Sequence, residues 1–219
     1  MPGYVTCMTM TSESGPHDGS GARRYHHGDL RTALLAAAEA ELAEKGVEGF
    51  TLRGCARRAG VSHAAPAHHF RDANALLTAL AGVGFERFVA SQKEAMAEAP
   101  SDPRSQLVAS GIGNIRFALA SPALFRLIFS SDRPDFDIPD LQRPATVAFT
   151  MLVDGVCAIR GGGALEDEAI MRDVYAAWAI AHGLADLLIT GRMKHLSAMP
   201  QAERERHLAE IIGRSMPER

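Results

Sequence analysis

The chain has 219 residues, a net charge of −3 and 47% hydrophobic residues. This balance predicts a soluble globular protein of one large or two modest domains, and it excludes a disordered chain and a polybasic one. No apolar run reaches the roughly 18 residues that a membrane-spanning helix needs, and the three cysteines form no CxxC pair. We therefore expect a cytoplasmic protein without a membrane anchor, a disulfide scaffold or a zinc ribbon.

Charge is unevenly distributed along the chain. Residues 1–20 are rich in Gly, Ser, Thr and Pro and lack the segments of a signal peptide, so we expect a disordered tail. Residues 21–71 contain eight Lys or Arg and five Asp or Glu, a net charge of +3, whereas residues 72–219 contain fifteen and nineteen, a net charge of −4. This asymmetry favours a module that faces a polyanion, joined to an acidic domain, although chance composition would also produce it.

Two helices are predicted near the start of the chain. Apolar residues recur every four positions from Asp29 to Lys45, which indicates an amphipathic helix capped by Asp29 and stopped by Gly46. A short second helix follows Thr51, its predicted cap, and ends at Gly60 because a sharp turn there favours glycine. Its buried side includes Cys55, which we interpret as a small core residue.

A third short helix, from His63 to about Phe70 and capped by Ser62, completes a helix-turn-helix pattern with the second. In this geometry the later helix enters the major groove and the earlier one crosses the phosphate backbone. A plain helical hairpin inside a bundle is the alternative. The candidate base-reading residues are Ser62, His63, Ala64, His68 and His69. The candidate phosphate contacts are Arg24, Tyr25, Arg53 and Arg57.

The rest of the chain is also predicted to be helical, which makes the fold class all-α. Proline after a polar residue is typical of a helix start, and clustered prolines are typical of a loop. We expect helices over about 72–99, from Pro103, from Pro122, over about 144–159, over about 166–190 and after Pro200. We expect loops at 132–144 and at Gly161–Gly163.

The segments YHHGDLRTALLAAAEAELAEKG, FTLRGCARRAGVSHAAPAHHF and RDANALL resemble the N-terminal DNA-binding domain of TetR-type transcriptional regulators from Tyr25 to Leu80. The resemblance implies a three-helix domain with 62–70 as the recognition helix. Farther along, LFRLIF and AWAIAHGLADLL are similar to a branch of the family with a Trp-x-x-x-His-Gly signature, here Trp178, His182 and Gly183.

The chain departs from the family pattern at three positions. Ala67 replaces a usual tyrosine and Ala73 a usual lysine, and both usual residues contact phosphate. We therefore expect a lower backbone affinity, or one carried by Arg71 and the N-terminal arm. Pro66 lies within the expected recognition helix, where it predicts a shortened or bent helix, because proline lacks the N–H group that helix geometry uses.

The resemblance also implies a domain division and a ligand site. We expect a helix-turn-helix domain over 21–71, continued by a helix to about 85, and an effector-binding and dimerisation domain over 86–219. The last two long helices, about 166–190 and 200–214, would form the homodimer. The candidate ligand-binding residues are Phe117, Phe125, Phe129, Trp178 and His182. The alternative is a core aromatic beside a hydrogen-bonded histidine, with Gly183 permitting close helix packing.

The resulting hypothesis is a sequence-specific DNA-binding regulator, a repressor released from a palindromic operator by a small-molecule effector. The sequence contains no GxSxG or HExxH motif and no histidine cluster with cysteine partners, so we expect no catalysis, no metal and no cofactor. Two alternatives stay open. One is an orphan regulator with impaired DNA binding, which the alanines at 67 and 73 suggest. The other is a small-molecule-binding protein or enzyme without operator activity.

Overall fold

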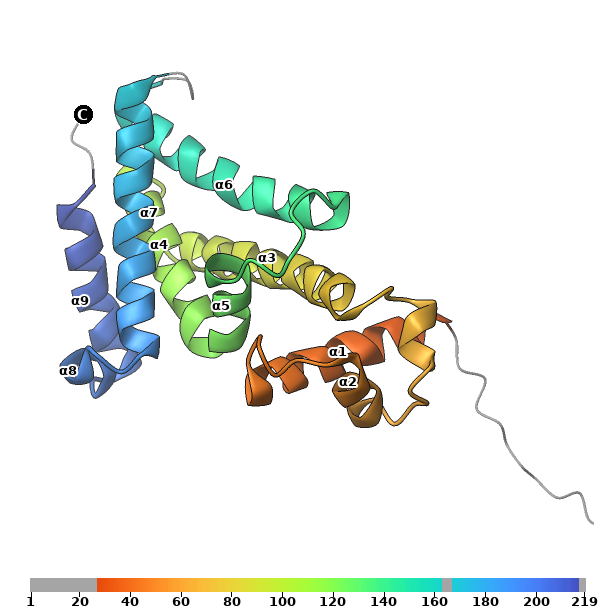
Figure 1. Cartoon of the computed structure of the whole chain (residues 1–219). Helices are drawn as coiled ribbons and strands as arrows, with labels where there is room; N and C mark the ends of the chain where they lie inside the picture. Colours follow the sequence, from red (N-terminus) through yellow and green to blue (C-terminus); the bar gives the residue numbers. More distant parts are fainter. Residues whose placement is uncertain (1–26, 163–166, 217–219) are drawn as a thin grey trace, which may run out of the picture.

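A computed structural model describes residues 27–162 and 167–216 (Figure 1). Within these ranges the chain forms nine α-helices and one 3₁₀ helix and no strands, which confirms the predicted all-α class. The helices are α1 (His27–Lys45), α2 (Leu52–Arg58), the 3₁₀ helix η1 (Ala65–His68), α3 (Ala73–Ala97), α4 (Pro103–Ala120), α5 (Pro122–Ser130), α6 (Pro139–Arg160), α7 (Glu168–Ile189), α8 (Lys194–Ser197) and α9 (Gln201–Arg214). The predicted tail and the arm residues Arg24 and Tyr25 lie outside the described residues.

The first two helices agree closely with the sequence pattern. Helix α1 begins two residues before the predicted cap Asp29, which therefore lies in its first turn, and it is followed by Gly46 at a φ of 67°. Thr51 caps α2 as predicted, because its hydroxyl oxygen accepts a hydrogen bond of 3.0 Å from the Gly54 N–H. Gly60 adopts a φ of 68°, the left-handed conformation that glycine tolerates at a helix end.

The recognition segment over 63–70 is shortened, as Pro66 predicts, to the single turn η1, and the predicted cap is wrong because Ser62 does not cap it. Pro66 explains the shortening. It has no N–H to donate to the Ser62 carbonyl four residues earlier, and the Ala65 N–H donates to that carbonyl instead at 3.0 Å. The His69 N–H likewise reaches only three residues back, to Pro66 at 2.9 Å. The chain is thus held in 3₁₀ geometry through this segment.

The remaining helices form the larger unit, in which α4 contacts α3, α5, α6, α7 and α9 (Figure 1). Pro103 and Pro122 open α4 and α5 as predicted, and the Asp102 carboxylate caps α4 by accepting from the Ser105 N–H at 3.0 Å. The predicted loop at 132–144 is too long, since α6 begins at Pro139 and accommodates Pro144 within its first turns. The sequence pattern also missed the short helix α8.

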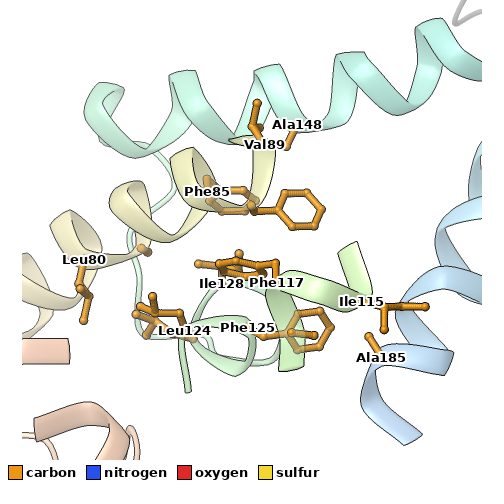
Figure 2. Packing of buried hydrophobic residues seen from close by; sticks show 14 of the residues in the cluster. Leu80, Phe85, Val89, Ile115, Phe117, Leu124, Phe125, Ile128, Ala148 and Ala185 are labelled. Atoms are coloured by element: carbon orange, nitrogen blue, oxygen red, sulfur yellow. The ribbon is translucent and has the colours of Figure 1, made fainter. Parts of the chain in front are cut away.

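The hydrophobic core joins α3, α4 and α5 through large side chains. Phe85 and Val89 of α3, Phe117 of α4, and Phe125 and Ile128 of α5 lie together, each less than a tenth exposed (Figure 2). Within the described ranges no single helix is long and apolar enough to cross a membrane. The bent pair α4–α5, at 114°, meets these criteria only as a pair.

Helices α3 and α4 approach each other closely where Gly113 of α4 meets α3. A Cβ atom on Gly113 would lie 2.4 Å from the Gln92 Cα and 2.6 Å from the Ser91 carbonyl oxygen. Both are backbone atoms that cannot rotate away. The hydroxyl of Ser91 also donates to the Gly113 carbonyl at 2.8 Å. Gly183 is different, because nothing lies within 4 Å of a Cβ added there, so it is not needed for packing within this chain.

Gly113→Ala should therefore lower the free energy of unfolding by about 2–3 kcal/mol, because the added methyl group forces α3 and α4 apart. Gly155→Ala on α6 is the matched control. Its Cβ would meet only the Leu107 Cδ1 at 3.0 Å, the end of a side chain that can turn aside. Urea denaturation followed by circular dichroism measures both variants. Equal effects of the two substitutions would show that the α3–α4 crossing is not tight.

Candidate DNA-binding surface and effector cavity

Helices α1 and α2 and the 3₁₀ helix η1 form one unit, which we call the headpiece. One side of α2 forms contacts within this unit. The Arg58 Nε donates to the Glu41 carboxylate at 2.5 Å, and its guanidinium also pairs with Glu44. Glu41 is only 3% exposed, so the ion pair compensates a charge that burial would otherwise disfavour. Hydrogen bonds from Lys45 and then from Arg58 lower the pKa of Glu44 to about 2. Arg58 is thus a structural residue of this unit.

The opposite side of α2 presents Arg53 and Arg57 to solvent. Among the residues that the structure describes, neither guanidinium forms an ion pair. Two unneutralised cations on one exposed face make this face a candidate phosphate-binding surface, because each guanidinium has donors of the kind that contact DNA backbone oxygens. Cys55, on the buried side, has no exposed surface, and burial raises the pKa of its thiol to about 11. This agrees with its interpretation as a core residue.

The segment around η1 brings the candidate base-reading residues together after α2. Ser62, His63, Ala64 and His68 are exposed, whereas His69 is half-buried, with its ring centroid 6.4 Å from that of Phe70. Ala67, which stands where the family pattern has a tyrosine, is also exposed.

Arg71 lies at the junction between the headpiece and α3. It is exposed and donates to the Asp72 carboxylate at 2.9 Å. The same carboxylate caps α3 by accepting from the Ala75 N–H at 2.8 Å. This backbone hydrogen bond, and then the bond from Arg71, hold the pKa of Asp72 below its ordinary value. Arg71 is therefore accessible to a phosphate, but a nearby carboxylate partly neutralises it.

A cavity of about 450 Å³ lies inside the larger unit, between α3, α4, α5, α6, α7 and α9. Its walls are mainly aromatic and aliphatic, and among the described residues that line it none is Asp, Glu, Lys, Arg or His. Its aromatic lining residues are Phe85, Phe88, Phe129, Phe136, Phe149 and Trp178, and its buried polar lining residues are Gln92, Ser110 and Asn114. This volume and composition are typical of a site for one small, mostly apolar molecule.

The structure separates the five candidate ligand residues into two groups. Phe129 and Trp178 line the cavity, and Trp178 is 39% exposed, with its ring centroid 6.3 Å from that of Phe149. Phe117, Phe125 and His182 do not line it. Phe125 is 1% exposed and stacks on His182 with a centroid separation of 4.8 Å. Phe117 and Phe125 belong to the core behind the cavity wall, and the half-buried His182 packs against Phe125 and Phe129 of α5 without lining the cavity.

Three polar cavity residues were missed by the sequence analysis. Gln92 of α3 and Ser110 and Asn114 of α4 are 6%, 5% and 4% exposed. The available signal was a polar residue on an otherwise apolar helix face, which needs a hydrogen-bonding reason when it is buried. The sequence shows these polar residues, but it does not show which helix face adjoins a cavity and which adjoins another helix. Their place in the cavity wall can therefore be assigned only from the fold.

Comparison with known families and structures decides the identity. The family model described as "Bacterial regulatory proteins, tetR family" matches residues 34–80, and the one described as "Tetracyclin repressor-like, C-terminal domain" matches residues 107–211. The chain belongs to the TetR family. As a member it is a transcriptional regulator that binds DNA and is not an enzyme. The Trp-x-x-x-His-Gly branch stays a prediction.

Solved structures agree with this membership. A protein of unknown function from Rhodococcus sp. RHA1 is 34% identical, with a TM-score of 0.71 over 89% of this chain and 98% of that one. A TetR family transcription regulator from Marinobacter aquaeolei VT8 is 18% identical, with a TM-score of 0.64 over 87% and 96%. A TetR-like transcriptional regulator from Rhodococcus sp. RHA1 is 14% identical, with a TM-score of 0.62 over 87% and 97%. No curated protein matches the sequence.

The buried histidine of this TetR-family chain predicts a pH dependence of stability. Burial lowers the pKa of His182 below its ordinary 6.5, and the nearby Asp186 offsets only part of this shift. The unfolded chain therefore binds a proton at this residue before the folded chain does. The stability contributed by neutral His182 is present above pH 6.5 and is lost as the pH falls from there through the lower pKa of the folded state.

The free energy of unfolding should thus decrease below pH 6.5 in the parent chain and decrease less steeply in His182→Gln. His195→Gln, at an exposed position on α8, is the control and should keep the parent slope. Chemical denaturation between pH 5 and pH 8 measures the slopes. If His182→Gln keeps the parent slope and His195→Gln loses it, the assignment to His182 is wrong.

Proposed function

We propose that this regulator is a homodimeric repressor that leaves a palindromic operator when a small molecule occupies the cavity. The observation that carries the proposal is the course of α3. Its N-terminus follows the headpiece directly after Asp72, and its second half supplies Phe85, Phe88 and Gln92 to the cavity wall. One continuous helix therefore belongs to both sites, so that a displacement at one end is transmitted to the other.

On the DNA side, we assign phosphate contacts to Arg53 and Arg57 of α2, to Arg71 and to the arm residues Arg24 and Tyr25. We assign base contacts to the segment around η1, with Ser62, His63, Ala64, His68 and His69.

Because a single turn spans few base pairs, one headpiece reads too short a sequence for useful specificity. Two copies placed one helical turn of DNA apart, about 34–36 Å, would read a two-fold-symmetric site.

The homodimer is supported by the outer face of α7. Tyr175 is 56% exposed and Leu187 is 39% exposed on this helix. Ala176 and Ala179 lie between them, exposed, and Gly183 has open space above it. Large apolar side chains beside small ones allow a second helix to approach closely, and a contiguous apolar face on a soluble protein favours association. We propose that α7 and α9 of two copies pair here.

A second route couples the cavity to the headpiece. Helix α5 contacts α1 and contributes Ile128 and Phe129 to the cavity wall. Arg87 of α3 donates to Glu39 of α1 at 2.6 Å and so ties the same two units together. A ligand that changes the spacing of α3 and α5 would therefore rotate α1 relative to α3, and with it the spacing of the two headpieces. Release follows when the ligand-bound spacing no longer fits the operator.

DNA binding should depend on the two unpaired arginines. Arg53→Ala and Arg57→Ala should each weaken binding to all DNA sequences and reduce the magnitude of the slope of log K against log salt by about 1, because each removes one phosphate contact. Arg143→Ala, an exposed arginine on α6, is the charge-matched control and should leave the slope unchanged. Fluorescence anisotropy measures binding to DNA from upstream of the gene, with random DNA as competitor.

The same set of variants tests repression. A reporter fused to that upstream DNA should be expressed more strongly with the Arg53→Ala/Arg57→Ala double variant than with the parent or with Arg143→Ala. Reduced expression would identify an activator instead. Equal, weak binding of the parent chain to both DNAs would favour a regulator that has lost its operator affinity, as Ala67 and Ala73 would explain.

Occupation of the cavity should lower operator affinity. N-phenyl-1-naphthylamine, a neutral aromatic fluorophore, is a suitable probe because the cavity wall is aromatic and uncharged. At saturation it should weaken operator binding by about 5- to 150-fold, the usual range of coupling between two sites. Leu152→Trp fills part of the cavity from α6 and should abolish the effect while leaving operator binding near the parent value. Undiminished release from Leu152→Trp would place the probe elsewhere.

A further inference from the structure

We propose that the effector is an uncharged, largely aromatic molecule that donates an N–H or O–H hydrogen bond to the carboxamides of Gln92 and Asn114 at the α3–α4 crossing. This inference rests on the proposed function in one respect only, namely that the molecule in the cavity acts as an effector. The ligand chemistry itself follows from the cavity wall.

The cavity wall excludes a charged ligand. As described above, no ionisable side chain lines it among the described residues. A carboxylate, phosphate or ammonium group placed there would lose its hydration without gaining a counter-charge, which costs several kcal/mol. The part of the molecule that is buried must therefore be neutral.

The aromatic walls favour a flat ligand. Phe129 meets both Phe85 and Phe88 edge to face, with centroids 5.7 Å and 5.2 Å apart, so these rings are fixed by one another. Phe149 and Trp178 face the cavity from α6 and α7. Aromatic pairs gain stability beyond the burial of area, and a ring inserted between these walls would gain the same contacts. Phe136 and Trp178, which are 42% and 39% exposed, mark where the cavity reaches the surface.

The polar groups supply the directional part of recognition. The Gln92 Nε2 donates to the Ser110 Oγ at 3.0 Å, which fixes the orientation of that carboxamide. Its Oε1 and the Asn114 Oδ1 are buried and accept no hydrogen bond within the described part of the chain. An unsatisfied buried acceptor costs about 1–3 kcal/mol, and a ligand that donates to it recovers that cost.

These acceptors lie beside the close contact between α3 and α4. Gly113 brings the α4 backbone against Gln92, and the hydrogen bond from Ser91 to the Gly113 carbonyl clamps the two helices beside the polar cluster. A fixed pair of acceptors in an apolar cavity rejects a ligand of equal shape that lacks the donor, because the acceptors then stay unpaired. The donor group therefore determines specificity, and the rings supply most of the affinity.

Three probes of related shape separate these contributions. N-phenyl-1-naphthylamine is neutral and has one N–H group, its N-methyl derivative has no donor, and 1-anilinonaphthalene-8-sulfonate carries a negative charge. Binding is followed by probe fluorescence and by quenching of Trp178, the single tryptophan of the chain. With the intact protein we expect N-phenyl-1-naphthylamine to bind about tenfold more tightly than either of the other probes.

Two nearly isosteric variants assign the preference to the carboxamides. Because the probe has one N–H group, the variant that removes its acceptor, Gln92→Met or Asn114→Leu, and the double variant should reduce the preference for the N–H probe over the N-methyl probe to less than about threefold. They should retain the helical circular dichroism of the parent. Gln142→Leu, an exposed glutamine on α6, is the control and should keep the full preference. If Asn114→Leu fails to fold, Asn114→Ala and Gln92→Met give the same comparison.

Two results would overturn the proposal. One is sulfonate binding as tight as that of the neutral probe. The other is a preference for the N–H probe that persists in both carboxamide variants, which would assign it to shape. Repeating the titrations on the operator complex separates this inference from the proposed function. If the N–H probe binds selectively but does not release DNA, the proposed ligand class is retained and control by an effector is rejected. If all three probes release DNA equally, control by an effector is retained and the proposed ligand class is rejected.

Discussion

The close contact between α3 and α4 is the constraint on which the rest of the structure depends. Without a side chain, Gly113 lets the α4 backbone approach Gln92 to a distance that any Cβ would prevent. This crossing fixes α3, the one helix shared by the headpiece and the cavity. It also holds Gln92, Ser110 and Asn114 side by side. The rigidity of the transmitting helix and the geometry of the polar cluster therefore have the same physical origin.

The headpiece shows how ion pairing separates structural from functional arginines. Three arginines occur within seven residues of α2, and the sequence alone does not distinguish them. Arg58 is bound to a buried glutamate and its neighbour, so its charge is neutralised within the protein. Arg53 and Arg57 remain available on the exposed face, where their positive potential extends into solvent. The surface that we propose faces DNA is thus defined as much by the acidic residues of α1 as by the arginines themselves.

Helix ends that are determined by neighbouring residues could be predicted from the sequence. Thr51, Gly60 and Pro103 act through their own backbone neighbours, and their predicted roles are found in the structure. The shortening of the recognition segment was also predicted, because Pro66 acts on its own backbone neighbours, but the apolar pattern does not show that only one 3₁₀ turn remains. The cavity residues were predicted only partly, because contacts between residues far apart in the sequence determine which side chains of α7 point toward the cavity. Trp178 and His182, one helical turn apart, lie on the cavity and in the core respectively.

The neutral, buried ligand that we propose would also limit how a signal could reach DNA. Because neither this ligand nor the cavity wall would carry charge, long-range electrostatics would not weaken the hold of the headpiece on phosphate. The change would have to be transmitted by shape, through a repacking of the helices around the cavity. The cavity lies between α3, which continues from the headpiece, and α5, which contacts α1. In the proposed mechanism the contacts that stabilise the ligand would therefore also set the angle of the headpiece, and ligands that fill the space between α3 and α5 differently should differ in release as well as in affinity.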